Sequence, residues 1–369
     1  MASHKFQPME CPIMIRTITR PSTAACTLPM YIGFLLSEPH ATSCLRLGSL
    51  LQISHDSVNR FLHREAYTPK DMFDEAKSTL NLIGGVLSVD DSVLDKPYSH
   101  YIGYVGYYYS GKHHAVVKGI NLITLYYTDP QGNHQPVNFR VYDKSENKTK
   151  NDYFQEMFFE VLMWGIKPLF VTMDSWYSGV KNLKKIKNNQ IGFCVALESN
   201  RLVSIERGSE IQIQKMEIAE NGTVVWLREF GYVKVFRTHL KNQVRHYAVY
   251  LPKNHDETSD EGDTALANFE KVDFQKLHDQ HWQIEQYHRT IKQVCNIESF
   301  QVRNKTAVKN HIFSAICGYV KLQQMRATDI IVNCYQLQRD MFNQIITTFI
   351  NSFIPSMAHM NSRYKTAIQ

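Results

Sequence analysis

The amino-acid sequence predicts an α/β protein with a mixed sheet, an inserted β-subdomain and an N-terminal all-α region of helix-turn-helix type. Three observations lead to this fold class. Residues 43–65 have the apolar spacing of two short helices, residues 86–197 alternate strand-like and helix-like segments, and residues 200–252 hold only short strands and turns. A chain of 369 residues is long enough for two to three structural units around a substantial core.

The composition is that of a folded globular chain. Apolar residues make up 43% of it and charged residues 21%, which excludes collagen-like and mostly disordered classes. The longest early apolar run, residues 30–36, is far shorter than the roughly 20 residues of a membrane-spanning helix. The seven cysteines form no CxxC pair, a pattern typical of reduced thiols. We therefore expect a soluble, intracellular protein.

The net charge of +6 is concentrated in the second half of the chain. Lys and Arg outnumber Asp and Glu by 13 to 6 in residues 181–253 and by 12 to 7 in residues 264–369, whereas residues 254–263 hold five acids and no base. Such a surplus can attract a polyanion, because Lys and Arg that neutralise phosphates release counterions. A solvated lysine-rich face is the simpler explanation of the same surplus.

Two amphipathic helices separated by a tight turn are expected near the N-terminus. Residues 43–52 place leucines on one side, and Ser54 follows as the N-cap of a helix whose apolar side includes Phe61. This second helix exposes Arg60 and Arg64, which are candidates for contact with a DNA duplex. An ordinary αα-hairpin within a helical bundle would have the same spacing.

The middle of the chain changes to strand periodicity. Strands are expected at residues 86–90, 114–129, 137–142, 169–173 and 191–197, with helices at 151–164 and 180–186. The resulting order of three strands, helix, strand, helix and strand is typical of ribonuclease-H-like cores. In such a core the first and fourth strands are neighbours.

The remaining boundaries follow from changes in composition. Short strands around an Asn221-Gly222 turn indicate the inserted β-subdomain, and the acidic stretch 255–263 is expected to be a solvated linker. Helical spacing returns at residues 274–292 and 307–324. The predicted units are a helical DNA-binding region (1–80), the first part of the core (81–199), the β-subdomain with its linker (200–263), the second part of the core (264–330) and a helical tail (331–369).

Three acidic residues lie where this fold would bring them together. Asp90 ends the first strand, Asp174 ends the fourth, and Glu285 lies in the middle of the helix expected at 274–292. Two Mg²⁺ ions about 3.5 to 4 Å apart, held by such carboxylates, activate the attacking oxygen and stabilise the leaving oxygen of a phosphoryl transfer. Strand-end aspartates are also common in turns and caps, so the spacing alone does not establish a site.

The residues around Glu285 strengthen this hypothesis. Helical spacing places Arg289 and Lys292 after it and His281 and His278 before it on the same helix face. That face is therefore acidic in the middle and cationic or protonatable on both sides. The alternative is a surface helix with a Glu285–Arg289 ion pair, which contributes only a few tenths of a kcal/mol.

These residues carry a resemblance to a known family. The segment Val89-Asp90-Asp91-Ser92 resembles the first acidic block of DDE transposases of the bacterial insertion-sequence type, families 4 and 701, and the segment from Met173 to Tyr177 resembles the second. Glu285 and Lys292, with six residues between them, resemble the end of the family's Tyr-Arg-Glu-Lys signature. Residues 109–121 are similar to the 701 group, and the resemblance extends over residues 40–325.

The resemblance implies cut-and-paste transposition on a ribonuclease-H-like core. Asp90, Asp174 and Glu285 would be the catalytic residues and the ligands of two Mg²⁺ ions, for which Mn²⁺ can substitute. The partners would be double-stranded DNA, at the element's terminal inverted repeats and at the target, and a second copy of the chain in a DNA-bound homodimer. Trp226 is the candidate for holding a flipped base, with core packing an equal alternative. The expected location is the bacterial cytoplasm, in association with the nucleoid.

The sequence departs from the family's pattern in the signature itself. His278 and His281 occupy the positions of the signature's Tyr and Arg, and they are the candidates for DNA contact at those positions. Arg289 and Lys292 remain as candidates for binding DNA phosphates.

The first acidic block contains two neighbouring aspartates, Asp90 and Asp91. Neighbouring strand residues face opposite sides of a sheet, so only one of the two can enter the site. The Asp-x-Ser spacing of the family's block favours Asp90.

Two other functions suit the same residues. One is a structure-selective DNA nuclease or resolvase on the same fold, and the other is a non-catalytic DNA-binding protein descended from a transposase. The intact set of three acids argues against loss of catalysis. Inverted repeats close to both ends of the gene would favour a mobile element.

Overall fold

The computed structural model describes residues 24–38, 42–206, 208–240, 243–252 and 259–348. Parts of three predicted units lie outside these residues. They are the first 23 residues of the N-terminal region, residues 253–258 of the acidic linker and the last 21 residues of the C-terminal tail.

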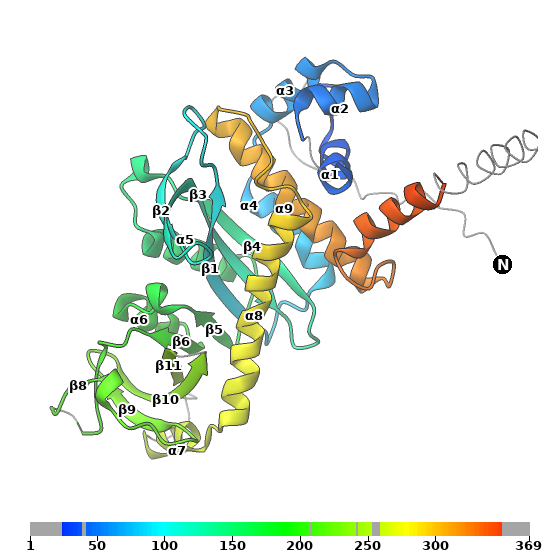
Figure 1. Cartoon of the computed structure of the whole chain (residues 1–369). Coiled ribbons are helices and arrows are strands. Elements are labelled where there is room, and N and C mark those ends of the chain that lie inside the picture. The colour runs from blue at the N-terminus through cyan, green and yellow to red at the C-terminus, as the bar shows by residue number, and fades with distance from the viewer. Residues whose placement is uncertain (1–23, 39–41, 207, 241–242, 253–258, 349–369) are drawn as a thin grey trace, which may run out of the picture.

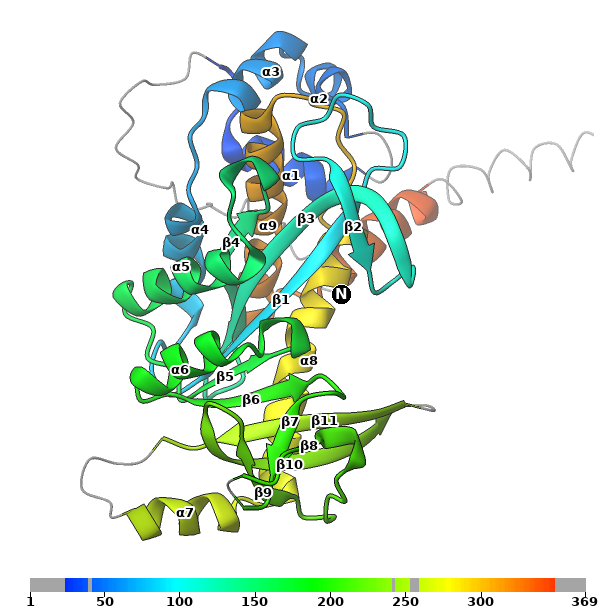
Figure 2. The same ribbon diagram turned by 90° about the vertical axis from the view of Figure 1, so that its left-hand side faces the viewer.

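The described residues form one mixed sheet of eleven strands (Figures 1 and 2). The strands are β1 (Val86–Asp95), β2 (Gly106–Ser110), β3 (Ala115–Thr128), β4 (His134–Val141), β5 (Phe170–Met173), β6 (Gly192–Leu197), β7 (Leu202–Ser204), β8 (Ile211–Gln212), β9 (Thr223–Leu227), β10 (Gly231–Leu240) and β11 (Gln243–Tyr250). Their order is β2-β3-β1-β5-β6-β11-β10-β9-β7-β8, and β4 pairs with β3.

The first half of the sheet has the predicted mixed topology. Strand β1 is antiparallel to β3 and parallel to β5, and β5 is parallel to β6. The expected adjacency of the first strand and the strand at 169–173 is confirmed by the β1–β5 pairing. The sheet edge that matters for the site is therefore the carboxyl end of β5 beside the middle of β1.

Helices cover both faces of this half (Figure 1). Helices α5 (Lys150–Met163) and α6 (Val180–Asn188) lie on one face, and α8 (Lys271–Gln293) and α9 (Lys305–Ala327) lie on the other. Most of the α9 side chains are buried around its whole circumference, as expected of a helix inside a core. We call the two faces the α5 face and the α8 face.

The N-terminal helices pack around α9. They are α1 (Leu28–Ser37), α2 (Cys44–Leu51), α3 (His55–Arg64) and α4 (Pro69–Ala76), and α1, α3 and α4 all contact α9. The expected pair of helices with a tight turn is present as α2 and α3, and the Ser54 hydroxyl caps α3 by accepting from the N–H of Asp56. A Cβ on Gly48 would lie 2.8 Å from the carbonyl oxygen of Ile53, so the close turn requires glycine there.

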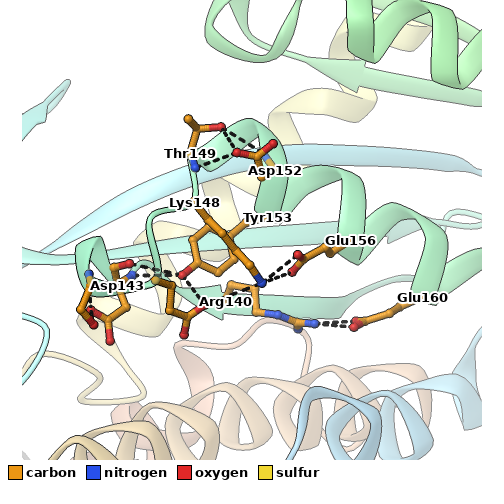
Figure 3. Close-up of polar contacts among 10 residues, drawn as sticks. Arg140, Asp143, Lys148, Thr149, Asp152, Tyr153, Glu156 and Glu160 are labelled. Carbon is orange, nitrogen blue, oxygen red and sulfur yellow. Dashed lines mark hydrogen bonds and ion pairs between the residues drawn. The ribbon is translucent and has the colours of Figure 1, made fainter.

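Helix α5 is held against β4 by a row of polar contacts (Figure 3). Thr149 and Asp152 cap its first turn reciprocally, and the Arg140 guanidinium of β4 contacts both carboxylate oxygens of Glu160 at 2.6 and 2.7 Å. Lys148 pairs with Glu156 at 2.8 Å. These contacts fix the position of α5, whose first residue, Lys150, reaches the site described below.

Three local expectations differ from the structure. Strand β2 was not predicted, because its run of tyrosines between glycines has no alternation of apolar and polar residues. Within the region expected to hold short strands, residues 211–215 form only the two-residue β8 and a 3-10 helix, Ile213–Lys215. Part of the expected acidic linker is helical, because α7 spans Ser259–Asn268.

The strands of residues 200–252 continue the central sheet. Strand β11 pairs with β6, with Tyr247 opposite Ala196, and β10, β9, β7 and β8 follow outward. The segment predicted as a β-subdomain therefore shares its hydrogen-bonding ladder with the core.

No helix in the described ranges is long and apolar enough to cross a membrane. The six cysteines within these ranges are free thiols, and five of them are buried. Burial raises the pKa of the Cys194 thiol to about 12, which leaves it protonated and unreactive at neutral pH.

Candidate active site

The two predicted aspartates stand level on neighbouring strands. Val89 of β1 is paired with Met173 of β5 in a parallel register, so the next residues, Asp90 and Asp174, lie side by side. Neighbouring strands are about 4.8 Å apart. Asp174 directly follows β5, and its carboxylate accepts from the N–H of Trp176 at 3.1 Å. The register therefore holds the two carboxyl groups in one place.

Helix α8 brings Glu285 to the same pair. The helix packs on β1, β3, β5 and β6, with Ile284 fully buried and Glu285 at the exposed rim. Partial desolvation of the carboxyl group and then the negative charge of Asp90 raise the pKa of Glu285. The three acids therefore form one electrostatic cluster.

The pKa values of the two aspartates are shifted in opposite directions. Burial, together with the charges of Asp90 and Asp91, raises the pKa of Asp174 from 3.8 to about 7. Burial also acts against ionisation of Asp90, but hydrogen bonding and charge from His288, with the charge of His281, bring its pKa below the ordinary value. The pair titrates as a coupled unit in which Asp90 loses its proton first.

Two histidines of α8 line the aspartates. His288 Nδ1 lies 3.4 Å from Asp90 Oδ2, and the His288 side chain is only 9% exposed. His281 Nδ1 lies 3.0 Å from the Thr172 hydroxyl, which lies 2.8 Å from the hydroxyl of Ser88. Between α8 and the sheet there is thus a polar layer inside an otherwise apolar interface.

Asp91 lies on the opposite side of the sheet, against α5. Its carboxylate accepts from Lys150 Nζ at 2.7 Å, Asn121 Nδ2 at 2.5 Å and the Tyr177 hydroxyl at 3.0 Å. With these three donors in contact, the carboxylate joins β1 to the start of α5, to β3 and to the segment after β5. Of the two neighbouring aspartates, Asp90 is the one on the same face as Glu285.

The carboxylates of Asp90, Asp174 and Glu285 offer oxygen ligands for a divalent cation. Within the described part of the chain, no group of three or more His, Cys, Asp or Glu side chains is arranged to hold a metal ion, so a closed cage is not preformed. The donor chemistry fits Mg²⁺ or Mn²⁺, which prefer carboxylate oxygens. Burial and then repulsion from Asp90 and Asp91 raise the pKa of Asp174, and a bound cation would relieve the repulsion. Asp90, Asp174 and Glu285 are the residues that would hold it.

The two cations that follow Glu285 on α8 differ in their surroundings. Arg289 is exposed, and its charge acts on Glu285 by favouring the ionised carboxylate. Lys292 donates to the carbonyl oxygen of Val93 at 2.7 Å and lies 3.5 Å from Glu298. Lys292 therefore ties α8 to the end of β1, whereas Arg289 faces solvent.

Residues Trp226 and His278 lie away from the aspartate pair. His278 packs edge-on against the Tyr247 ring of β11, with ring centroids 5.1 Å apart. Trp226 of β9 is paired with Tyr232, and the strand registers place it level with Phe170 at the start of β5. Four strand spacings, about 19 Å, therefore separate Trp226 from β5 across the sheet. Along the strand direction, Trp226 is roughly 13 Å from Asp174.

Trp226 instead lines a separate cavity of about 660 Å³. Its ring meets that of Tyr232 edge-on at 5.1 Å, and Phe230, Tyr250 and Lys187 line the same cavity. This cavity opens at the opposite strand ends from the aspartates.

Arg60 and Arg64 are exposed on α3. The buried side of α3 carries Phe61 and Leu62 and packs on α9. Figure 2 shows α2 and α3 at one end of the molecule and β7 to β10 at the other. The two arginines are therefore separate from the carboxylate cluster.

Sequence reasoning missed four residues that contact the aspartates: His288, Lys150, Tyr177 and Asn121. His288 is three residues after Glu285, a spacing that puts both on one helix face and could have identified it. No local pattern connects Lys150 or Tyr177 with Asp91, because they are 59 and 86 residues away along the chain.

A mixed sheet that sets two aspartates on adjacent strands beneath a glutamate-bearing helix defines an α/β protein with an Asp-Asp-Glu site. Residues 84–321 match the family described as "Transposase DDE domain", and the chain belongs to that family. The match covers every residue of the Asp-Asp-Glu set. No curated protein matches the sequence.

Solved structures give only weak similarity. The Drosophila P element transposase strand transfer complex is 12% identical with a TM-score of 0.25, over 52% of this chain and 49% of that one. Marinitoga piezophila Argonaute in complex with guide RNA is 12% identical with a TM-score of 0.19, over 52% of this chain and 26% of that one. The chain thus spans about half of the Drosophila transposase chain and about a quarter of the Argonaute chain.

Proposed function

We propose that this chain is a DNA transposase that cleaves the ends of a mobile element and joins them to target DNA. The observation that supports it most directly is the level register of Asp90 and Asp174 beneath Glu285, in a chain of the transposase DDE family. The cut-and-paste order of steps, recognition of terminal inverted repeats and a DNA-bound homodimer belong to the same proposal.

The residues of the site would have different roles in phosphoryl transfer. Asp90, Asp174 and Glu285 would hold two Mg²⁺ ions, which supply an activated attacking oxygen and stabilise the leaving oxygen. His288 orients Asp90 from the α8 side, and His281 contacts the Thr172 hydroxyl beneath the aspartates. Asp174, with its pKa near 7, is half-protonated at neutral pH until a cation binds.

DNA contacts are proposed for separate parts of the molecule. Exposed Arg289 is beside the carboxylates and suits the phosphate next to the cleaved bond, with Lys292, His278 and His281 along the same helix. Arg60 and Arg64 on the capped helix α3 suit the element's end sequence. The aromatic cavity around Trp226 suits an unpaired base.

The decisive test compares Asp174→Asn with Asp279→Asn on duplex DNA that carries the sequences flanking the gene. Asp279 is an exposed acid on the same helix as Glu285 but away from the aspartate pair, so its variant controls for the loss of one negative charge from α8. We expect Mg²⁺-dependent strand cleavage by the wild type and by Asp279→Asn, and none by Asp174→Asn, with DNA binding equal in all three. Full cleavage by Asp174→Asn would refute the site.

The same assay separates the other functions. Cleavage without joining of the freed 3′ end to a second duplex would identify a nuclease or resolvase. Binding without cleavage by the wild type in Mg²⁺ or Mn²⁺ would identify a non-catalytic DNA-binding protein.

A further inference from the structure

One segment of the chain combines many tyrosines with an absence of acids. Residues 96–118 contain six of the chain's 20 tyrosines, three lysines and three histidines, and the first acid after them is Asp129. In the structure this segment forms the end of the long loop after β1, strand β2 and the start of β3. No step of the proposed reaction uses it.

Two of these tyrosines stand on an exposed face of the β2–β3 ribbon. Tyr107 is paired with Lys118 and Tyr109 with Val116. The rings of Tyr107 and Tyr109 are 66% and 63% exposed, and Val116 is 64% exposed. Paired residues in an antiparallel ladder share a face, so these four side chains form one surface, which we call the tyrosine ribbon.

The tyrosine ribbon is on the α8 face, the same face as Asp90. Asp90 is paired with Thr124 of β3, and every second residue from Thr124 back to Lys118 and Val116 shares that face. Lys118 is six residues from Thr124, a distance of roughly 20 Å along the strand. The tyrosine ribbon and the carboxylate cluster therefore lie on the same side of the sheet, with the fully buried Ile120 and Leu122 between them.

The loop that leads into the ribbon is held against the segment before α9. The loop after β1 is pinned by Lys96, whose ammonium donates to the carbonyl oxygen of Phe300 at 2.8 Å, and by the N–H of Gly103, which donates to Arg303 at 2.8 Å. The guanidinium of Arg303 lies over the Tyr101 ring at 5.4 Å. Figure 2 shows this loop reaching the segment that precedes α9. The surface is thus held in place before any partner arrives.

The ring spacing indicates the kind of partner. Tyr107 and Tyr109 are two residues apart on one strand face, a separation of about 6.8 Å, which is twice the 3.4 Å rise between stacked bases. Aromatic rings beside cations bind single strands by stacking. Residues 96–128 contain no acid, and the neighbouring Asp95 is paired with Lys112 and His113.

We propose that the tyrosine ribbon binds a DNA strand with unpaired bases, stacking a base on Tyr107 and Tyr109 while Lys118 and Arg303 contact its phosphates. This inference rests on the proposed function, because it assumes that DNA is the substrate. It adds a binding site for a single-stranded segment outside the carboxylate cluster.

The test measures binding of a fluorescent single-stranded oligonucleotide and of the matching duplex by anisotropy, without divalent cations so that no cleavage occurs. We expect Tyr107→Ala/Tyr109→Ala to bind the single strand about tenfold or more weakly and the duplex nearly as tightly as the wild type. Phe159→Ala, which removes an exposed ring from α5 on the other face, should change neither. Tyr107→Phe/Tyr109→Phe keeps the rings and should bind as the wild type does.

Each result decides the inference independently of the transposase proposal. Unchanged single-strand binding by the double alanine variant would overturn it, as would an equal loss for the duplex or an equal loss in the double phenylalanine variant. If the double alanine variant does not fold, Lys118→Gln replaces it: the slope of log binding constant against log salt should fall by about one, and an unchanged slope would overturn the phosphate contact. Failure of the transposase proposal would show instead as Mg²⁺-dependent cleavage that persists in Asp174→Asn.

Discussion

The neighbouring carboxylates of Asp90 and Asp91 have opposite surroundings on the two faces of the central sheet. On the α5 face, Asp91 is satisfied by Lys150, Asn121 and Tyr177. On the α8 face, Asp90 lies beside another aspartate, with a histidine at 3.4 Å as its counter-group. One carboxylate has its charge neutralised by the fold, while the other is kept among like charges. The difference separates a residue that holds parts of the structure together from the residues proposed to act in phosphoryl transfer.

The largest expected effect is on the α8 face. Asp90→Asn keeps the shape of the side chain but removes a cation ligand, so Mg²⁺-dependent cleavage should fall by about a hundredfold to a thousandfold or more. Thermal unfolding should show little loss of stability. Gel analysis of cleaved strands and a melting curve measure the two quantities. An Asp90→Asn variant that is destabilised but still cleaves DNA would contradict this prediction, because Asp90 would then have a structural and not a catalytic role.

Asp91→Ala should act mainly on stability. It leaves the Lys150 ammonium, 17% exposed, without its carboxylate, and loss of one partner from such a pair costs about 3 kcal/mol. Urea unfolding measures this loss. The double variant Asp91→Ala/Lys150→Met should recover part of it, because no uncompensated charge remains. Stability equal to that of the wild type in Asp91→Ala would contradict the structural role.

The pH dependence of stability should distinguish the faces further. The pKa of Asp174 is about 7 in the folded chain and 3.8 in the reference state, so the folded state binds this proton more tightly. Without divalent cations, the stability from this group is therefore present below about pH 4 and is lost as the pH rises to 7. The melting temperature of the wild type should fall by a few degrees over this range relative to Asp174→Asn. Parallel pH profiles of the two proteins would contradict the raised pKa.

The smallest effect is expected at the outer side of α5. The Arg140–Glu160 pair in Figure 3 is bidentate but partly exposed, with side chains 21% and 36% accessible. Solvent screens such a pair, so Glu160→Gln should cost no more than about 1 kcal/mol in urea unfolding and leave cleavage unchanged. If Glu160→Gln lowered the free energy of unfolding as much as Asp91→Ala, burial would not explain the difference between the Arg140–Glu160 and Lys150–Asp91 pairs.

Local patterns identified most of the elements that build the site. The apolar runs before Asp90 and Asp174 predicted β1 and β5, and helical spacing around Glu285 predicted α8. The pair of helices with its Ser54 cap was also predicted correctly. These features depend on residues only a few positions apart, which is the range over which periodicity and capping act.

Other features depended on pairing between strands. Strand β2 forms because residues 106–110 pair with residues 115–119 of β3 in a hairpin, and nothing within the strand itself required it. Likewise, the strands after Leu197 join the main sheet through β11, a pairing that strand propensity does not specify. Propensity describes a residue's own backbone, whereas pairing depends on which partner is within reach.

The sequence by itself determined the class of this protein, because three acids after recognisable apolar segments belong to one family pattern. Only the tertiary structure decided which of Asp90 and Asp91 joins Glu285, that His288 stands beside them, and that Trp226 lies at the far strand ends. The physical reason is that side-chain alternation is set by strand register, and register depends on the hydrogen-bonding partners across the sheet.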